Sequence, residues 1–125
     1  MMRWLFVAAF LPTPLIAEGA IQSWACAIER LCPSGARCFD TNQFAIFIIE
    51  PVAVGPDGTG DFTVNRGDDT YLMQDLTGNG LLIWSEAPGD REILSFTGGN
   101  TFLWQRYKGD TDSSDIAFLT CEVSQ

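Results

Sequence analysis

The chain has 125 residues, of which 16 are acidic, 7 are basic and none is histidine, so its formal net charge is −9. An acidic surface repels nucleic acid and anionic lipid, so we expect neither as a partner; it serves solubility or attracts a basic protein. Without histidine the chain cannot build a Ser–His–Asp or Cys–His nucleophilic site or a histidine-ligated metal centre.

The N-terminal segment has the features of a secretory signal peptide. The basic start Met1–Arg3 precedes an apolar run, Trp4–Ala17, and Glu18 ends the apolar character. A membrane-spanning helix needs about 20 apolar residues and would be broken by the two prolines in this run. We therefore expect residues 1–17 to be removed, with no membrane insertion afterwards, and residues 18–125 to form a single β domain that is periplasmic or secreted.

Turn signals recur about every ten residues along the remaining chain, which is typical of a small all-β sandwich or barrel. Glycine and proline interrupt every stretch that is long enough for a stable helix. The segments between the turns predict about eight strands: Ile21–Ile28, Phe44–Val54, Asp61–Asn65, Thr70–Leu76, Leu81–Ser85, Arg91–Phe96, Thr101–Tyr107 and Ile116–Val123. Strands in an up-and-down order close naturally into an antiparallel barrel, which removes exposed edges.

Some segments depart from this simple pattern of strands and turns. Residues 29–42 are expected to form a cysteine-bearing loop that could include a helical turn, and Pro51 is expected at a bend or an edge. Phe44–Ile49 and Leu81–Trp84 are apolar on both alternating faces. Such strands are either covered on the outside, here by the N-terminal loop, or form a contact surface, and coverage is the more common explanation.

Four cysteines in a short exported chain predict two disulfides. Three pairings are possible, and we favour Cys32–Cys38 because the segment CPSGARC contains proline and glycine and can turn back on itself. That pairing leaves Cys26–Cys121, which would tie together the two ends of the domain. Cysteine zinc sites usually pair residues two to four positions apart, whereas five, five and 82 residues separate these cysteines, so we expect no metal and no cofactor.

Carboxylates are the remaining candidates for chemistry. Paired carboxylates can hydrolyse a glycoside, but the available pairs all lie in turns, where acidic residues are common; they are Asp57 with Asp61, Asp68 with Asp69, and Glu86 with Asp90. The segment from Asp75 to Glu86 has the length of an EF-hand calcium loop, but its flanks indicate strands, so a β-hairpin explains the same glycines. We therefore assign no catalytic residue and expect no enzyme.

The C-terminal segment GGNTFLWQRYKGDTDSSDIAFLTCEV, residues 98–123, resembles the end of the membrane-bound and periplasmic inhibitors of C-type lysozyme. Those proteins are exported eight-stranded antiparallel barrels in which a tryptophan-bearing strand leads into a Lys-Gly loop, and a near-terminal cysteine pairs with an early one. The resemblance implies binding roles for Trp104, Lys108 and Asp110, with Lys108 on the loop that enters the lysozyme cleft. The family's Ser-Gly-x-x-Tyr loop has no counterpart before this strand.

The sequence thus predicts an exported, monomeric, non-enzymatic binding or inhibitor-type module, directed against a basic partner such as a lysozyme. The alternatives are a carrier of a small apolar ligand inside the barrel, and an envelope protein with a purely structural role.

Overall fold

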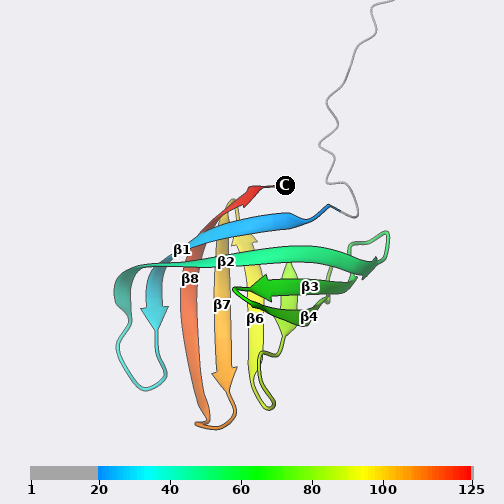
Figure 1. Ribbon diagram of the computed structural model, residues 1–125. Helices are drawn as coiled ribbons and strands as arrows, with labels where there is room; N and C mark the ends of the chain where they lie inside the picture. The colour runs from blue at the N-terminus through cyan, green and yellow to red at the C-terminus, as the bar shows by residue number, and fades with distance from the viewer. Residues whose placement is uncertain (1–19, 125) are drawn as a thin grey trace, which may run out of the picture.

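The computed structural model describes residues 20–124, which form eight antiparallel strands closed into one barrel (Figure 1). The strands are β1 (Gln22–Cys32), β2 (Phe39–Val54), β3 (Gly60–Arg66), β4 (Asp69–Asp75), β5 (Leu81–Trp84), β6 (Arg91–Gly98), β7 (Thr101–Lys108) and β8 (Ser113–Ser124). This confirms the all-β prediction and decides between the two architectures that the sequence left open, because a sandwich would not be closed. The predicted signal peptide lies outside the described residues.

Each strand pairs with its neighbours in sequence, and β1 pairs with β8 to close the barrel. In Figure 1, β1 and β2 run across β6, β7 and β8 at a steep angle, so the barrel is flattened into two crossing halves. Because the barrel is closed, Pro51 does not lie on a sheet edge. It lies at a register irregularity between β2 and β3, where the N–H group that proline lacks is not needed for regular strand pairing.

The core follows from the two-residue alternation of strand side chains. Along β2, Ala45, Phe47 and Ile49 point into the barrel and are buried, while the residues between them point outward and are exposed. Phe47 lies at the centre of the core, where its ring makes edge-on contacts with Trp84 and Trp104 at centroid distances of 5.9 and 5.3 Å.

The prediction of a long loop over residues 29–42 is wrong. β1 continues to Cys32 and β2 begins at Phe39, so only residues 33–38 connect them. A register irregularity between Ile28 and Arg30 turns β1 so that its last residues pair with both β2 and β8. The polar side chains of this segment face outward beyond the bulge. Their polarity therefore indicated a loop in the sequence, although the segment is a strand.

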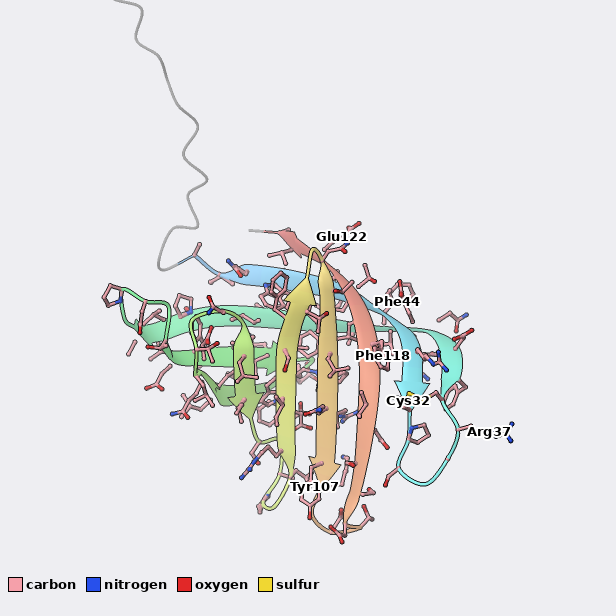
Figure 2. The ribbon with its side chains drawn as sticks, turned by 180° about the vertical axis from the view of Figure 1, so that it is seen from behind. Cys32, Arg37, Phe44, Tyr107, Phe118 and Glu122 are labelled. Carbon is pink, nitrogen blue, oxygen red and sulfur yellow. A yellow bond between two sulfur atoms is a disulfide. The ribbon has the colours of Figure 1, made fainter. Side chains whose placement is uncertain are left out.

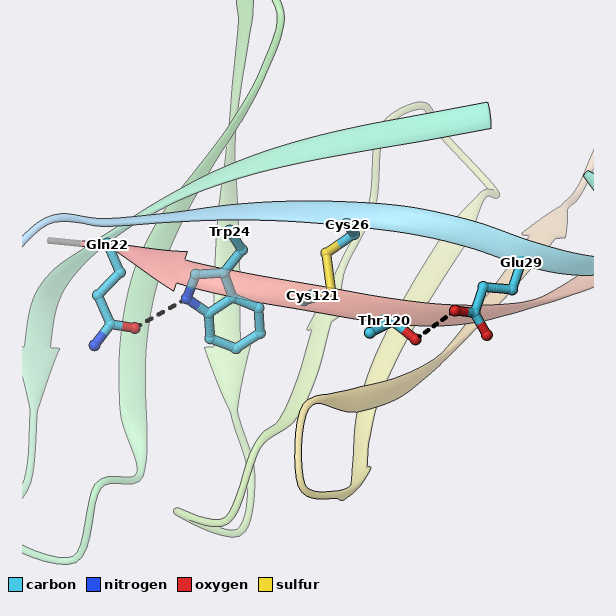
Figure 3. The surroundings of a disulfide bond; sticks show 6 residues. All are labelled: Gln22, Trp24, Cys26, Glu29, Thr120 and Cys121. Atoms are coloured by element: carbon cyan, nitrogen blue, oxygen red, sulfur yellow. Dashed lines mark hydrogen bonds between the residues drawn. A yellow bond between two sulfur atoms is a disulfide. The ribbon is translucent and has the colours of Figure 1, made fainter. Parts of the chain in front are cut away.

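Both predicted disulfides are confirmed: Cys26 is bonded to Cys121 and Cys32 to Cys38. The first joins β1 to β8, with its two residues directly opposite each other in the ladder (Figure 3). The second closes the short connection between β1 and β2. Two disulfides are consistent with an oxidising, exported location. Between residues 20 and 124 the chain contains no helix that is long and apolar enough to span the membrane.

The barrel has two ends, which we name after one inward-facing residue each. The Arg66 end carries the turns that follow β1, β3, β5 and β7, and the Asp75 end carries the turns that follow β2, β4 and β6.

Candidate functional site

The structure separates the three residues that the sequence nominated for binding. Trp104 points into the core and is only 2% exposed, so its side chain is not available to a protein partner. Lys108 is the last residue of β7 and Asp110 lies in the following turn, and both are exposed at the Arg66 end. The structure therefore brings Lys108 and Asp110 into one turn without Trp104, and their binding role stays a prediction.

The turn that carries Lys108 is held against the turn between β5 and β6. The backbone N–H of Gly109 donates a hydrogen bond to Oδ1 of Asp90 at 3.1 Å. A Cβ atom at position 109 would lie 2.4 Å from the carbonyl oxygen of Gly89, so only glycine allows this approach. The glycine of the Lys-Gly pair thus has a structural cause that is independent of any partner.

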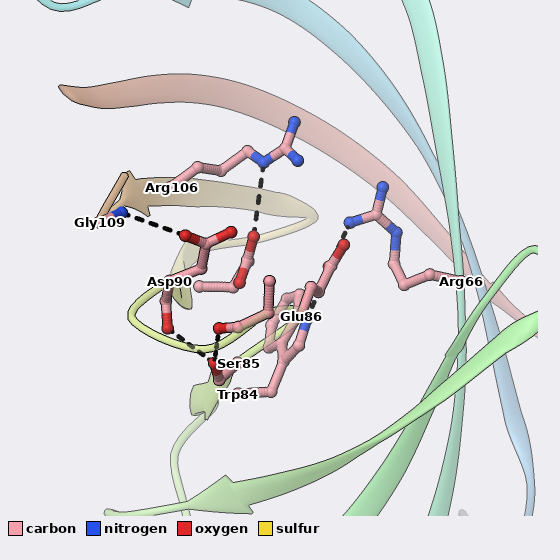
Figure 4. A network of polar contacts seen from close by, with 9 residues as sticks. Arg66, Trp84, Ser85, Glu86, Asp90, Arg106 and Gly109 are labelled. Atoms are coloured by element: carbon pink, nitrogen blue, oxygen red, sulfur yellow. Dashed lines mark hydrogen bonds and ion pairs between the residues drawn. The ribbon is translucent and has the colours of Figure 1, made fainter. Parts of the chain in front are cut away.

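The Arg66 end contains a polar network that faces the barrel interior (Figure 4). Nη1 of Arg66 forms an ion pair with Oε2 of Glu86 at 2.8 Å, and Nε1 of Trp84 donates a hydrogen bond to the same oxygen at 2.8 Å. The guanidinium carbons of Arg66 and Arg106 each lie 4.6 Å from the centroid of the Trp104 ring. These cation–π contacts and the shared carboxylate fix the side chains in place.

Glu92 is the most deeply buried charged residue of this network, at 1% exposure. Its Oε1 lies 3.7 Å from Nε of Arg106, and its Oε2 has no hydrogen-bond partner among the described residues. Burial and the nearby charge of Glu86 raise the pKa of the Glu92 carboxyl. A raised pKa is a property of general acids, but at 1% exposure Glu92 contacts Arg106 inside the barrel rather than solvent.

Sequence reasoning missed this network. Arg66, Glu92 and Arg106 have the same alternation phase as buried neighbours two positions away, such as Leu94 and Trp104. That phase could have revealed charged side chains pointing into the barrel.

The carboxylate of Asp75 is held by its own turn. Oδ1 of Asp75 accepts hydrogen bonds from the backbone N–H groups of Thr77 and Gly78 at 3.1 and 2.8 Å, and Glu86 lies beyond the other end of β5. The hairpin interpretation of the segment from Asp75 to Glu86 is therefore the correct one. Across residues 20–124, no three or more His, Cys, Asp or Glu side chains gather in a way that could hold a metal ion.

The outer surface of β1, β2 and β8 exposes apolar side chains. Phe44 is 78% exposed and Ile46 is 58% exposed, so the expectation that the chain covers this strand is not met by the described residues. Strand register places Ala27 between Phe44 and Thr120, and Ala25 between Ile46 and Glu122, so small side chains separate the two flanking strands.

We name this region the apolar–acidic face. It comprises the apolar residues Ala25, Ala27, Phe44, Ile46, Ile48 and Phe118 and the bordering carboxylates Glu29, Glu50 and Glu122. Figure 2 labels Phe44, Phe118 and Glu122 on this side of the barrel. One guanidinium, that of Arg30, borders the face opposite Phe118 in the ladder. Large exposed apolar patches rimmed by polar residues are typical of interaction sites.

A pocket of about 480 Å³ opens at the Asp75 end. Its walls are largely apolar and include Trp24, Ile49, Phe62 and Leu82, all of which point into the barrel. The side chain of Trp24 is held in place by a hydrogen bond of 3.0 Å from its Nε1 to Oε1 of Gln22, seen in Figure 3. The volume is within the range of sites for small organic molecules.

Comparisons with known proteins give no match: no family model, no curated protein and no solved structure corresponds to this chain. The resemblance of residues 98–123 to the lysozyme inhibitors therefore stays a prediction from the sequence.

Proposed function

We propose that this protein is an exported, non-enzymatic binding module, periplasmic or secreted, that binds a basic protein through the apolar–acidic face. The observation that carries the proposal is the exposure of Phe44 and Ile46 on the outside of a closed barrel, with carboxylates bordering them. A face of this composition supplies both contact area and charge for a partner.

The apolar side chains account for affinity. Fully burying a large apolar side chain contributes about 1.5–3 kcal/mol, so removing Phe44, Ile46 and Phe118 from water together is a substantial driving force. Short side chains at Ala25 and Ala27 let a partner approach the strands closely.

The carboxylates favour a basic partner. Glu29, Glu50 and Glu122 surround the apolar residues, and the whole chain has a net charge of −9. Complementary charge speeds encounter and excludes partners of like charge. A second copy of this chain would bring like charges together, so we propose a different, cationic protein, and C-type lysozyme is the specific candidate.

Absence of catalysis is part of the proposal. The chain has no histidine, and the carboxyl group with the raised pKa, that of Glu92, is buried inside the barrel. A rigid, disulfide-linked scaffold with polar turns supports binding better than turnover.

The test uses the mature protein and C-type lysozyme, with affinity measured by calorimetry and inhibition by lysis of cell walls. We expect binding that weakens with salt and is reduced at least tenfold by Ile46→Glu, which places a charge at the centre of the face. Leu72→Glu is the matched control, because Leu72 is exposed on β4, outside the face.

Lysis that stays undiminished at high excess of the protein, together with no measurable binding, would reject lysozyme as the partner. An Ile46→Glu variant that binds as tightly as Leu72→Glu would reject the face. Lys108→Ala distinguishes binding through the apolar–acidic face from binding through the turn after β7. This variant weakens binding only if that turn enters the lysozyme cleft.

A further inference from the structure

We infer that the pocket at the Asp75 end binds a small organic cation with an apolar body, such as an arylalkyl amine. This site lies at an end of the barrel and does not depend on the apolar–acidic face. The inference rests on the pocket's apolar walls, on two carboxylates in its lining, and on the lack of any basic residue in that lining.

The two carboxylates belong to Asp57, in the turn after β2, and to Asp75, at the end of β4. The turns are in direct contact, because a Cβ atom on Gly78 would lie 2.0 Å from the carbonyl oxygen of Asp57. Glycine at position 78 therefore allows the second turn to pack on the first, which places both acidic residues in the lining of one pocket.

Both carboxylates accept hydrogen bonds within their own turns, but no basic side chain of the pocket lining neutralises them. Hydrogen bonds from the backbone N–H and the hydroxyl of Thr59 lower the pKa of Asp57, so this group is ionised at neutral pH. Asp75 is only 9% exposed. Neither residue has an ion-pair partner between residues 20 and 124. A cationic head group in this pocket would meet acidic side chains and no competing basic side chain of the lining.

The walls select an organic cation over a metal ion. Calcium takes six to eight oxygen ligands, whereas most of this pocket is lined by side chains such as Ile49, Phe62 and Leu82. Trp24 and Phe62 add aromatic surface to the lining, which suits an apolar body and is compatible with a cationic head group. Amine recognition by carboxylates and aromatic rings thus explains both components of the lining.

The experiment measures binding of three probes of similar shape by calorimetry at pH 7: naphthylmethylamine, naphthylmethanol and naphthoate. We expect the amine to bind at least tenfold more tightly than the alcohol, and the carboxylate to bind most weakly. An alcohol that binds as tightly as the amine, or an amine that does not bind at millimolar concentration, would overturn the inference.

The variants Asp57→Asn and Asp75→Asn, combined in one protein, remove the charge and keep the Oδ1 acceptors that hold the two turns. We expect this double variant to lose the preference for the amine. Asp68→Asn, which loses one charge in the exposed turn after β3 at the opposite end of the barrel, is the control and keeps the preference. Equal affinity of the double variant and the control for the amine would also overturn the inference. No basic protein is present in this assay, so its failure is separate from that of the proposed function.

Discussion

The Cys26–Cys121 bond is expected to be the largest single covalent contribution to the stability of the barrel. It joins residues 95 positions apart, whereas Cys32–Cys38 joins residues six positions apart. In the chain-entropy model, closing these loops stabilises the folded state by about 4.7 and about 2.2 kcal/mol, respectively. The longer bond thus amounts to a large fraction of the roughly 5–15 kcal/mol by which a domain of this size is stable.

Two double variants isolate each bond without deleting its sulfur atoms. In Cys32→Ala with Cys38→Ala, mild reduction breaks only the bond between β1 and β8; in Cys26→Ala with Cys121→Ala, it breaks only the short loop. Urea unfolding of the oxidised and reduced forms should show a loss about 2.5 kcal/mol larger for the long loop. The slope of free energy against urea should also rise on reduction, because the unfolded chain expands. Equal losses, or a larger loss for Cys32–Cys38, would refute the reasoning.

Three further predictions concern the Arg66 end. Gly109→Ala should destabilise the fold by about 1–3 kcal/mol in thermal unfolding, since its Cβ would collide with the carbonyl oxygen of Gly89; an unchanged melting temperature would contradict this contact. Glu92→Gln should become more stable relative to the natural protein as pH rises above 4.5, the ordinary glutamate pKa. The raised pKa of Glu92 means that its contribution to stability is fully present below pH 4.5 and is lost as the buried carboxyl ionises at higher pH. If urea unfolding from pH 4 to 8 gave the same difference in stability between the two proteins at every pH, the prediction would be contradicted. Glu86→Ala should lower the free energy of unfolding by about 2 kcal/mol in the same assay, because Nε1 of buried Trp84 and the Arg66 guanidinium lose their acceptor. As a control, removing the exposed carboxylate of Glu50 should change stability by less than about 0.5 kcal/mol.

The pocket and the apolar–acidic face are different consequences of one architecture. Closing eight strands into a barrel leaves two ends and one continuous outer surface. At the Asp75 end, contact between two glycine-containing turns frames a pocket. On the outside, β2 is long enough to present a row of large apolar side chains away from the core. The two sites can therefore be tested, and altered, independently.

The sequence alone was sufficient for the fold class and for the covalent links. Enrichment in β-branched and aromatic residues, as in Phe44–Val54, and turn signals at regular spacing indicate strands because both are local properties of the chain. The disulfide pairing was also accessible, since a short segment with proline and glycine between Cys32 and Cys38 leaves one pairing for the other two cysteines.

Residues 29–42 show where local reasoning was insufficient. Their polar character indicated a loop, but pairing with β2 and β8 turns most of this segment into strand after a bulge near Ile28. Hydrogen bonds to strands that are distant in sequence stabilise this conformation, so no local propensity reports it.

Only the tertiary structure decided which side chains meet. Moving a strand by one residue exchanges its inner and outer faces, so the position of Trp104 in the core and of Phe44 on the surface depends on register across the whole barrel. The approach of Asp57 to Asp75, and of Arg66 and Arg106 to one tryptophan ring, joins residues from different strands and turns. Composition and spacing contain no information on such juxtapositions, because closure of the barrel creates them.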